Sequence, residues 1–178
     1  MENIDQHLHH LSYGGLYIHG RDKKQRPIVI QRARDLFDNG IGSDNFIHLN
    51  DIVLGYTVQN AMVPGKIEQF HYIIDAGDLK AWEIPVKQLV NFVTHTSKFY
   101  RHRAFKVHVI NLPWMIRKMI NFLYNFLDDF QKQQLKYFGT DFREALLEDI
   151  SADNLEQKYG GSAPDIKRGE YWPPRINI

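Results

Sequence analysis

Two short strand-like segments separated by a helical one constrain the fold more than any other feature of this chain. Residues 70–74 and 107–110 are rich in β-branched and aromatic side chains and end at turn residues, which is typical of strands. Between them, Pro85 suits the first turn of a helix, and apolar side chains recur at helical spacing over 86–100. A strand, a helix and a second strand form a βαβ unit, the signature of a parallel sheet. The sequence therefore predicts an α/β fold with a mainly parallel central sheet flanked by helices.

The segment before this unit adds to the sheet and its cover. Runs 16–18 and 27–30 are rich in strand-forming residues and flank a turn-forming stretch, which indicates a hairpin. Asp44 can cap a helix whose apolar residues recur at helical spacing up to Tyr56, and Pro64 and the glycine after it lie beyond its expected end. Two strands and a helix are therefore expected there.

The chain is short enough to form one domain. At 178 residues it can bury a sizeable core but is not comfortably divided into two. The polar start reads as a loosely held lead-in segment, and the prolines near the end mark an irregular tail after a last helix over 142–150. We therefore expect a lead-in over 1–15, one domain over 16–162 and a tail over 163–178.

A wide apolar face runs along residues 115–130. If these residues form one helix, its polar side chains crowd into about a third of the circumference, and the rest is apolar and aromatic. An amphipathic helix most often just covers a core, but this apolar arc is wider and more aromatic than a simple surface helix needs. We expect one long helix here.

Composition excludes several classes of protein. The chain has no cysteine, so it has no disulfide, thiolate metal site or cysteine nucleophile. A net charge of +1 argues against nucleic acid as the main partner, because phosphate binding relies on clustered positive charge. No apolar run is long enough to span a bilayer, and the start does not resemble a signal peptide. We expect a cytoplasmic protein.

Catalytic motifs are absent from the sequence. It contains no Gly-x-Ser-x-Gly elbow, no Gly-x-Gly-x-x-Gly fingerprint and no phosphate-binding loop. Asp128 and Asp129 are adjacent and point different ways on a helix, so they suit the end of a helix better than a pair of acid and base. His7, His9 and His10 could hold a metal, but a polar lead-in offers nothing to orient them. We expect no enzyme activity, no metal and no cofactor.

Several short motifs follow one another in an order that a known family shares. They are the hairpin sequence over 20–28, Ile-Ile-Asp-Ala-Gly over 73–77, Tyr-Arg-His-Arg over 100–103, Asn-Leu-Pro-Trp over 111–114, Phe-Leu-Asp over 126–128, Leu155 and Tyr-Gly-Gly over 159–161. Each motif is weak alone, but their order resembles the CRAL-TRIO family, typified by a yeast phosphatidylinositol/phosphatidylcholine transfer protein. The correspondence is nearly continuous over 70–162 and weaker over 33–69. The helical bundle that normally precedes this domain has no counterpart before Leu16.

The resemblance implies the CRAL-TRIO fold, in which a hydrophobic pocket lies between the sheet and an amphipathic helix that acts as its gate. It implies a bound lipid or other hydrophobic molecule as cargo rather than a substrate, and transient contact with a membrane surface. Carried over position by position, the expected pocket residues are Phe70, Tyr72, Ile74, Ala104, Val107, Val109, Met115, Met119, Leu123, Phe126 and Leu127.

The headgroup positions depart from the family pattern. Members that bind phosphatidylinositol have a glutamate and a lysine where this chain has His102 and Gln134, and a neutral glutamine cannot supply charge to a phosphate. Members that bind choline lipids have small hydroxyl residues where this chain has Phe70 and Tyr72. The resemblance thus implies weak phosphatidylinositol transfer and a more apolar or differently headed ligand, such as a sterol, tocopherol-like or retinoid-like molecule or another phospholipid.

Two functions stay open at this point. Basic residues near the expected gate, Arg101, Arg103 and Arg117, would meet anionic lipid headgroups if the domain is a lipid carrier. Alternatively, the same fold serves as an interaction module of a signalling protein, with a closed or permanently filled pocket and a protein partner or membrane surface. These arginines are equally consistent with a charged surface that contacts only water.

Overall fold

The computed structural model describes residues 4–38, 43–84 and 86–174. A five-stranded sheet lies at its centre, with the strands in the same order in space as along the chain. The first two strands are antiparallel, and every later neighbour is parallel. The fold is therefore the predicted α/β fold with a mainly parallel sheet, and its strands are β1 (Leu16–Arg21), β2 (Pro27–Arg32), β3 (Phe70–Asp75), β4 (Ala104–Ile110) and β5 (Leu135–Tyr137).

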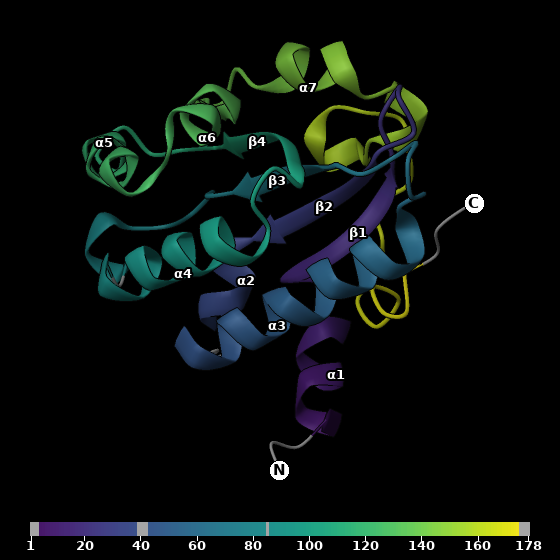
Figure 1. Cartoon of the computed structure of the whole chain (residues 1–178), viewed down its shortest axis with the longest axis horizontal. Coiled ribbons are helices and arrows are strands. Elements are labelled where there is room, and N and C mark those ends of the chain that lie inside the picture. Colours follow the sequence, from purple (N-terminus) through teal and green to yellow (C-terminus); the bar gives the residue numbers. More distant parts are fainter. Residues whose placement is uncertain (1–3, 39–42, 85, 175–178) are drawn as a thin grey trace.

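Helices cover both faces of this sheet (Figure 1). One face carries α3 and α4 and the other carries α7, an arrangement that a parallel sheet requires because both of its faces are apolar. The longer helices are α3 (Ser43–Tyr56) and α4 (Val86–Phe99), and the shorter ones are α1 (Ile4–Ser12), α2 (Ala33–Asp38), α5 (Arg117–Leu123), α6 (Asp129–Gln134) and α7 (Arg143–Asp149). None of the helices in the described ranges is long and apolar enough to cross a membrane.

Alternation along the strands divides the core in two. On β3, Ile73 packs on the α7 side of the sheet, whereas Tyr72 packs on the α3 side. The pairing of β3 with β4 contains an irregularity: Phe70 pairs with Ala104 but His71 pairs with Lys106, so one extra residue lies in β4. Because of it, Ala104 and Val107 of β4 both face the α3 side, although they are three positions apart. Strand alternation thus fixes which side chains are available to a cavity on each face.

The expected helix over 115–130 is two helices. After α5 the chain makes a short 3₁₀ turn over Tyr124–Phe126, and Leu127 is extended. Asp128 then starts α6: its carboxylate accepts a hydrogen bond from the Gln131 backbone N–H at 2.8 Å, and the Gln131 side chain accepts one from the Asp128 N–H at 3.1 Å. This capping box gives a new helix its own start, so the apolar pattern continues while the helix axis does not.

Both ends of the described chain pack more tightly than the sequence indicates. The expected loose lead-in forms α1, whose Leu11 is buried in the core. In the expected irregular tail, the Tyr171 ring packs against Tyr17 with centroids 4.7 Å apart. The short elements α2 and β5 were not predicted, because neither has enough residues to show a periodic pattern. The domain limits at 16 and 162 stay predictions.

Candidate ligand-binding pocket

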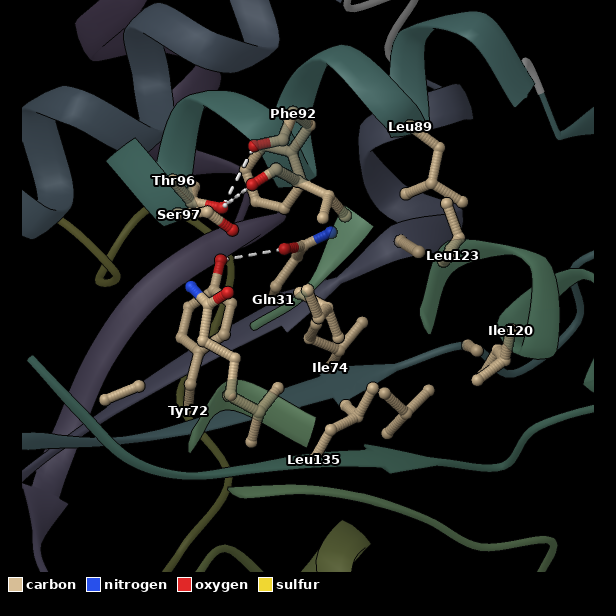
Figure 2. A pocket seen from close by; sticks show the side chains of 18 of the residues that line it. Gln31, Tyr72, Ile74, Leu89, Phe92, Thr96, Ser97, Ile120, Leu123 and Leu135 are labelled. Atoms are coloured by element: carbon tan, nitrogen blue, oxygen red, sulfur yellow. Dashed lines mark hydrogen bonds between the residues drawn. The ribbon is translucent and has the colours of Figure 1, made fainter. Parts of the chain in front are cut away.

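A cavity of about 400 Å³ lies between the sheet and the helices on the α3 and α4 side. Side chains of β2, β3 and β4 line its floor, and α4, α5 and α6 enclose it from the opposite side (Figure 2). Its volume is at the lower end of the range of pockets that hold drug-sized ligands, about 300 to 1,000 Å³. The cavity is therefore large enough to hold a substantial apolar group.

Local sequence patterns explain why these side chains meet. Tyr72 and Ile74 are two apart on a strand, so they point to the same face. Leu89, Phe92 and Val93 recur at the spacing of one helix face, and α4 turns that face toward the cavity. The apolar pattern of α4 is the same as that of a helix over a filled core.

Most of the predicted pocket residues line this cavity. The structure brings together ten of the predicted pocket and headgroup positions, which are Phe70, Tyr72, Ile74, Ala104, Val107, Val109, Leu123, Leu127, His102 and Gln134.

Two predicted pocket residues lie elsewhere. Met115 is 50% exposed and precedes the first residue of α5, so no helical turn directs it inward. Phe126 is 40% exposed and lies on the 3₁₀ turn, where its ring packs against Phe122 with centroids 5.3 Å apart. Placing both in the lining was wrong, because that inference assumed one continuous helix. The side chain of Met119 lies outside what the structure describes.

The α4 wall and Gln31 on β2 are pocket residues that the sequence did not single out as a site. The apolar spacing along α4 was visible in the sequence. It indicated that one face of the helix points inward, but it did not indicate a cavity under that face. At the ends of the expected inward face, Val86 is 41% exposed, and Tyr100 rather than Phe99 lines the cavity. Gln31 occupies an apolar strand position, and a polar residue at such a position was the signal that could have found it.

The described cavity lining lacks side chains that carry a fixed charge. Among the described residues that line it, none is lysine, arginine, aspartate or glutamate. The polar groups are hydroxyls and carboxamides, together with the His102 imidazole. Burial raises the pKa of the Tyr72 hydroxyl above its ordinary value, so it stays protonated. Such a lining favours an uncharged ligand, because a buried charge without a partner is costly.

The two headgroup positions are held by protein contacts. Gln134 donates its amide N–H to the Ala104 carbonyl at 2.6 Å, which ties α6 to β4. His102 has a left-handed backbone with φ of 62°, and its ring packs edge-on against Phe130 with centroids 4.6 Å apart. Neither residue meets a lining cation, so the cavity offers a phosphate no fixed positive charge.

The three predicted membrane-contact arginines differ in their surroundings. Arg101 is exposed and lies 3.3 Å from the Asp128 carboxylate, and Arg117 is exposed at the start of α5. Arg103 donates to the Glu68 carbonyl at 3.2 Å, which fixes it to the loop before β3. Large apolar side chains are exposed around α5 and α6, namely Trp114, Met115, Phe122, Phe126 and Phe130.

A second polar cluster lies on the opposite face of the sheet. In the described ranges, His71, His108 and Asp149 form the group whose donor atoms lie close enough to hold a metal ion, within 4.8 Å of one another. However, His71 Nε2 and His108 Nδ1 are 2.8 Å apart and share a hydrogen bond, and Asp149 forms an ion pair with Lys106 at 2.5 Å. The donor atoms thus have protein partners, and we interpret the cluster as buried polar packing.

Comparison with known proteins identifies the family to which this α/β domain belongs. The CRAL/TRIO domain model matches residues 11–161, so the chain belongs to the CRAL/TRIO domain family, a family of lipid-binding and lipid-transfer proteins.

Curated relatives include Sec14 cytosolic factors of fungi. That of Schizosaccharomyces pombe is 39% identical over 67 residues, covering 38% of this chain and 23% of the relative. That of Eremothecium gossypii is 25% identical over 166 residues, covering 86% of this chain and 54% of the relative. This chain therefore spans about half or less of these relatives.

A solved structure confirms the fold. The crystal structure of Sfh5 superposes with a TM-score of 0.67 at 12% sequence identity, covering 88% of this chain and 57% of that one.

Proposed function

We propose that this domain carries an uncharged, mostly apolar lipid in its cavity and exchanges it between membranes without catalysis. The observation that carries the proposal is the lining: it is predominantly apolar, and its described residues include no lysine, arginine, aspartate or glutamate. Burial of apolar surface stabilises such a complex by roughly 0.8 kcal/mol for each methylene group removed from water. Membership of a lipid-binding family supports the same function.

The proposed gate is α5. It contributes Ile120 and Leu123 to the cavity lining, its N-cap residue Ile116 also lines the cavity, and its other side is exposed. The extended Leu127 separates it from α6, so α5 can move without disturbing the helix that is tied to β4. Exposed Trp114 and Phe122 would enter the membrane when the gate meets it. This gives a peripheral, reversible membrane association in the cytoplasm.

The experiment that tests the function is recovery of the bound molecule. Native mass spectrometry of the purified protein, followed by organic extraction, should show a neutral lipid at close to one molecule per chain. Absence of any lipid, together with no transfer between liposomes, would favour the interaction module instead.

Liposome transfer then tests the class of lipid. Labelled phosphatidylinositol should transfer at least about tenfold more slowly than a neutral lipid, because the cavity offers its phosphate no cation. The double variant His102→Glu with Gln134→Lys should raise phosphatidylinositol transfer. Rapid phosphatidylinositol transfer by the unmodified protein would contradict the proposal.

A further inference from the structure

Gln31 and Tyr72, which line the cavity, form a chain of contacts with the buried Asn50 of α3. The Tyr72 hydroxyl lies 2.8 Å from Gln31 Oε1 and 3.0 Å from Asn50 Oδ1. All three residues are buried, at 7%, 6% and 0% exposure for Gln31, Tyr72 and Asn50. They come from β2, β3 and α3, so the contact forms only in the folded chain.

In the structure the Tyr72 hydroxyl donates to Gln31 Oε1. A phenol has a single proton, so Tyr72 can donate to one of the two oxygens. The Asn50 amide nitrogen is buried and has no partner in the described part of the chain. Turning that carboxamide by half a rotation lets Asn50 donate to the Tyr72 oxygen, and Tyr72 then donates to Gln31.

This direction fixes what Gln31 presents to the cavity. Its oxygen is engaged by Tyr72, so its amide nitrogen points the other way, into the space under α4 (Figure 2). No acceptor in the described chain bonds this nitrogen, and Gln31 lines the cavity. The cavity therefore contains an oriented N–H donor and needs an acceptor from its ligand.

The ends of the cavity differ in polarity. Figure 2 shows the Tyr72 hydroxyl and Gln31 of the floor and Ser97 of α4 toward one end of the cavity, with Ile120 and Leu123 of α5 toward the other. Thr96 is not a competing donor, because its hydroxyl bonds the Phe92 and Val93 carbonyls of its own helix. A ligand with one polar end therefore fits with that end at Gln31 and its apolar part under α5.

We infer that the ligand is an apolar molecule with one uncharged oxygen acceptor, a hydroxyl or carbonyl, that binds the Gln31 amide. This rests on the proposed function and narrows it to a chemical class. A bare hydrocarbon leaves the donor without a partner. An ionised carboxylate accepts the bond, but its charge meets no cation among the described lining residues.

Three probes of matched chain length test this inference: oleyl alcohol, octadecene and oleate. Each is offered in labelled form in phosphatidylcholine vesicles at mildly alkaline pH, where the acid is ionised, and the label bound to recovered protein is counted. The unmodified protein should take up the alcohol about tenfold better than either other probe, a difference of about 1.4 kcal/mol.

Gln31→Leu should reduce alcohol uptake to the level of octadecene and leave octadecene uptake unchanged. Tyr72 keeps Asn50 as a partner in this variant, so the fold should persist. Gln133→Leu is the matched control, since Gln133 is exposed on α6 outside the cavity. It should behave as the unmodified protein.

Two results would overturn the inference while leaving the proposed function intact. One is equal uptake of alcohol and octadecene by the unmodified protein. The other is an equal loss of both probes in Gln31→Leu, which would show that Gln31 only shapes the cavity. Failure to take up any of the three probes would instead contradict the proposed function, and the inference with it.

Discussion

Leu123 and Phe126 are three positions apart on one apolar stretch, yet they have opposite surroundings. Leu123 is 8% exposed and lines the cavity, whereas Phe126 is 40% exposed and lies outside it. Ordinary helix geometry would bring them to one face, but α5 ends at Leu123. A substitution at Leu123 should therefore affect binding in the cavity, whereas one at Phe126 changes the surface.

Leu123→Asp should abolish loading of a labelled neutral lipid, because an unpaired carboxylate in the cavity costs several kcal/mol. Phe126→Asp introduces the same group at the surface and should load normally. Uptake from vesicles measures both, and circular dichroism confirms that both variants fold. Normal loading of Leu123→Asp would show that α5 does not enclose the ligand.

His108 makes stability depend on pH. Burial, with smaller effects of His71 and Lys106, lowers the pKa of His108 to about 3, and Lys136 acts in the same direction while Asp149 opposes it. An unfolded histidine has a pKa of about 6.5. Between these values the unfolded chain binds a proton that the folded chain does not, so this contribution to stability is present above about pH 6.5 and is lost as the pH falls.

Urea unfolding between about pH 7 and about pH 5 measures this effect. The free energy of unfolding should fall by up to about 1.4 kcal/mol per pH unit from this group below its unfolded pKa. His108→Gln should reduce the slope of the free energy of unfolding against pH by that amount. Equal slopes in the variant and the unmodified protein would show that His108 is not held neutral by the fold.

At the scale of elements, the capping box at Asp128 is what divides α5 from α6. A backbone hydrogen bond from Gln131 lowers the pKa of the Asp128 carboxyl, which is the expected electrostatic result of a cap. The break lets α5 end against the cavity while α6 stays tied to β4 through Gln134. The proposed gate is therefore a short separate helix.

Asp128→Ala should make the amides in the first turn of α6 exchange roughly fivefold faster, because the Gln131 N–H loses its acceptor. Asp128→Asn keeps an acceptor oxygen and should change the exchange little. Hydrogen exchange resolved by residue measures both. If Asp128→Asn exchanges as fast as Asp128→Ala, the ion pair with Arg101 and not the cap holds this turn.

At the scale of the molecule, exposed apolar and basic groups lie around α5 and α6. Trp114 is 75% exposed, Arg117 is exposed at the start of α5, and the exposed Arg101 pairs with Asp128 at the start of α6. Lys106 does not belong to this group, because it pairs with Asp149 of α7. If the proposed gate meets an anionic membrane, we expect the attraction to come from Arg101 and Arg117 and not from Lys106.

Binding to anionic vesicles should weaken as salt is raised, because the screening length falls to about 10 Å at 0.1 M salt. Arg117→Gln should weaken binding at low salt, since each basic group near an anionic surface contributes about 1 kcal/mol. Lys167→Gln removes the same charge from an exposed site in the tail and should have little effect. Vesicle sedimentation measures all three proteins, and salt-insensitive binding would leave hydrophobic insertion as the sole attraction.

The sequence alone determined the sheet and its direction. The strand-forming runs 70–74 and 107–110, with a helical pattern between them, were enough to predict a parallel βαβ unit, because strand and helix preferences are properties of the local chain. Tyr72 and Ile74 are two apart on one strand and therefore share a face, and both line the cavity. The order of the motifs correctly indicated the family.

Only the tertiary structure decided where that face is filled and where it is hollow. An apolar helix face reads the same over a core or a cavity, so α4 showed no sign of the space beneath it. The break at Asp128 depended on a choice between continuing a helix and capping a new one. The donor at Gln31 depended on partners from two other elements, and such contacts between residues distant in sequence are settled when the elements pack together.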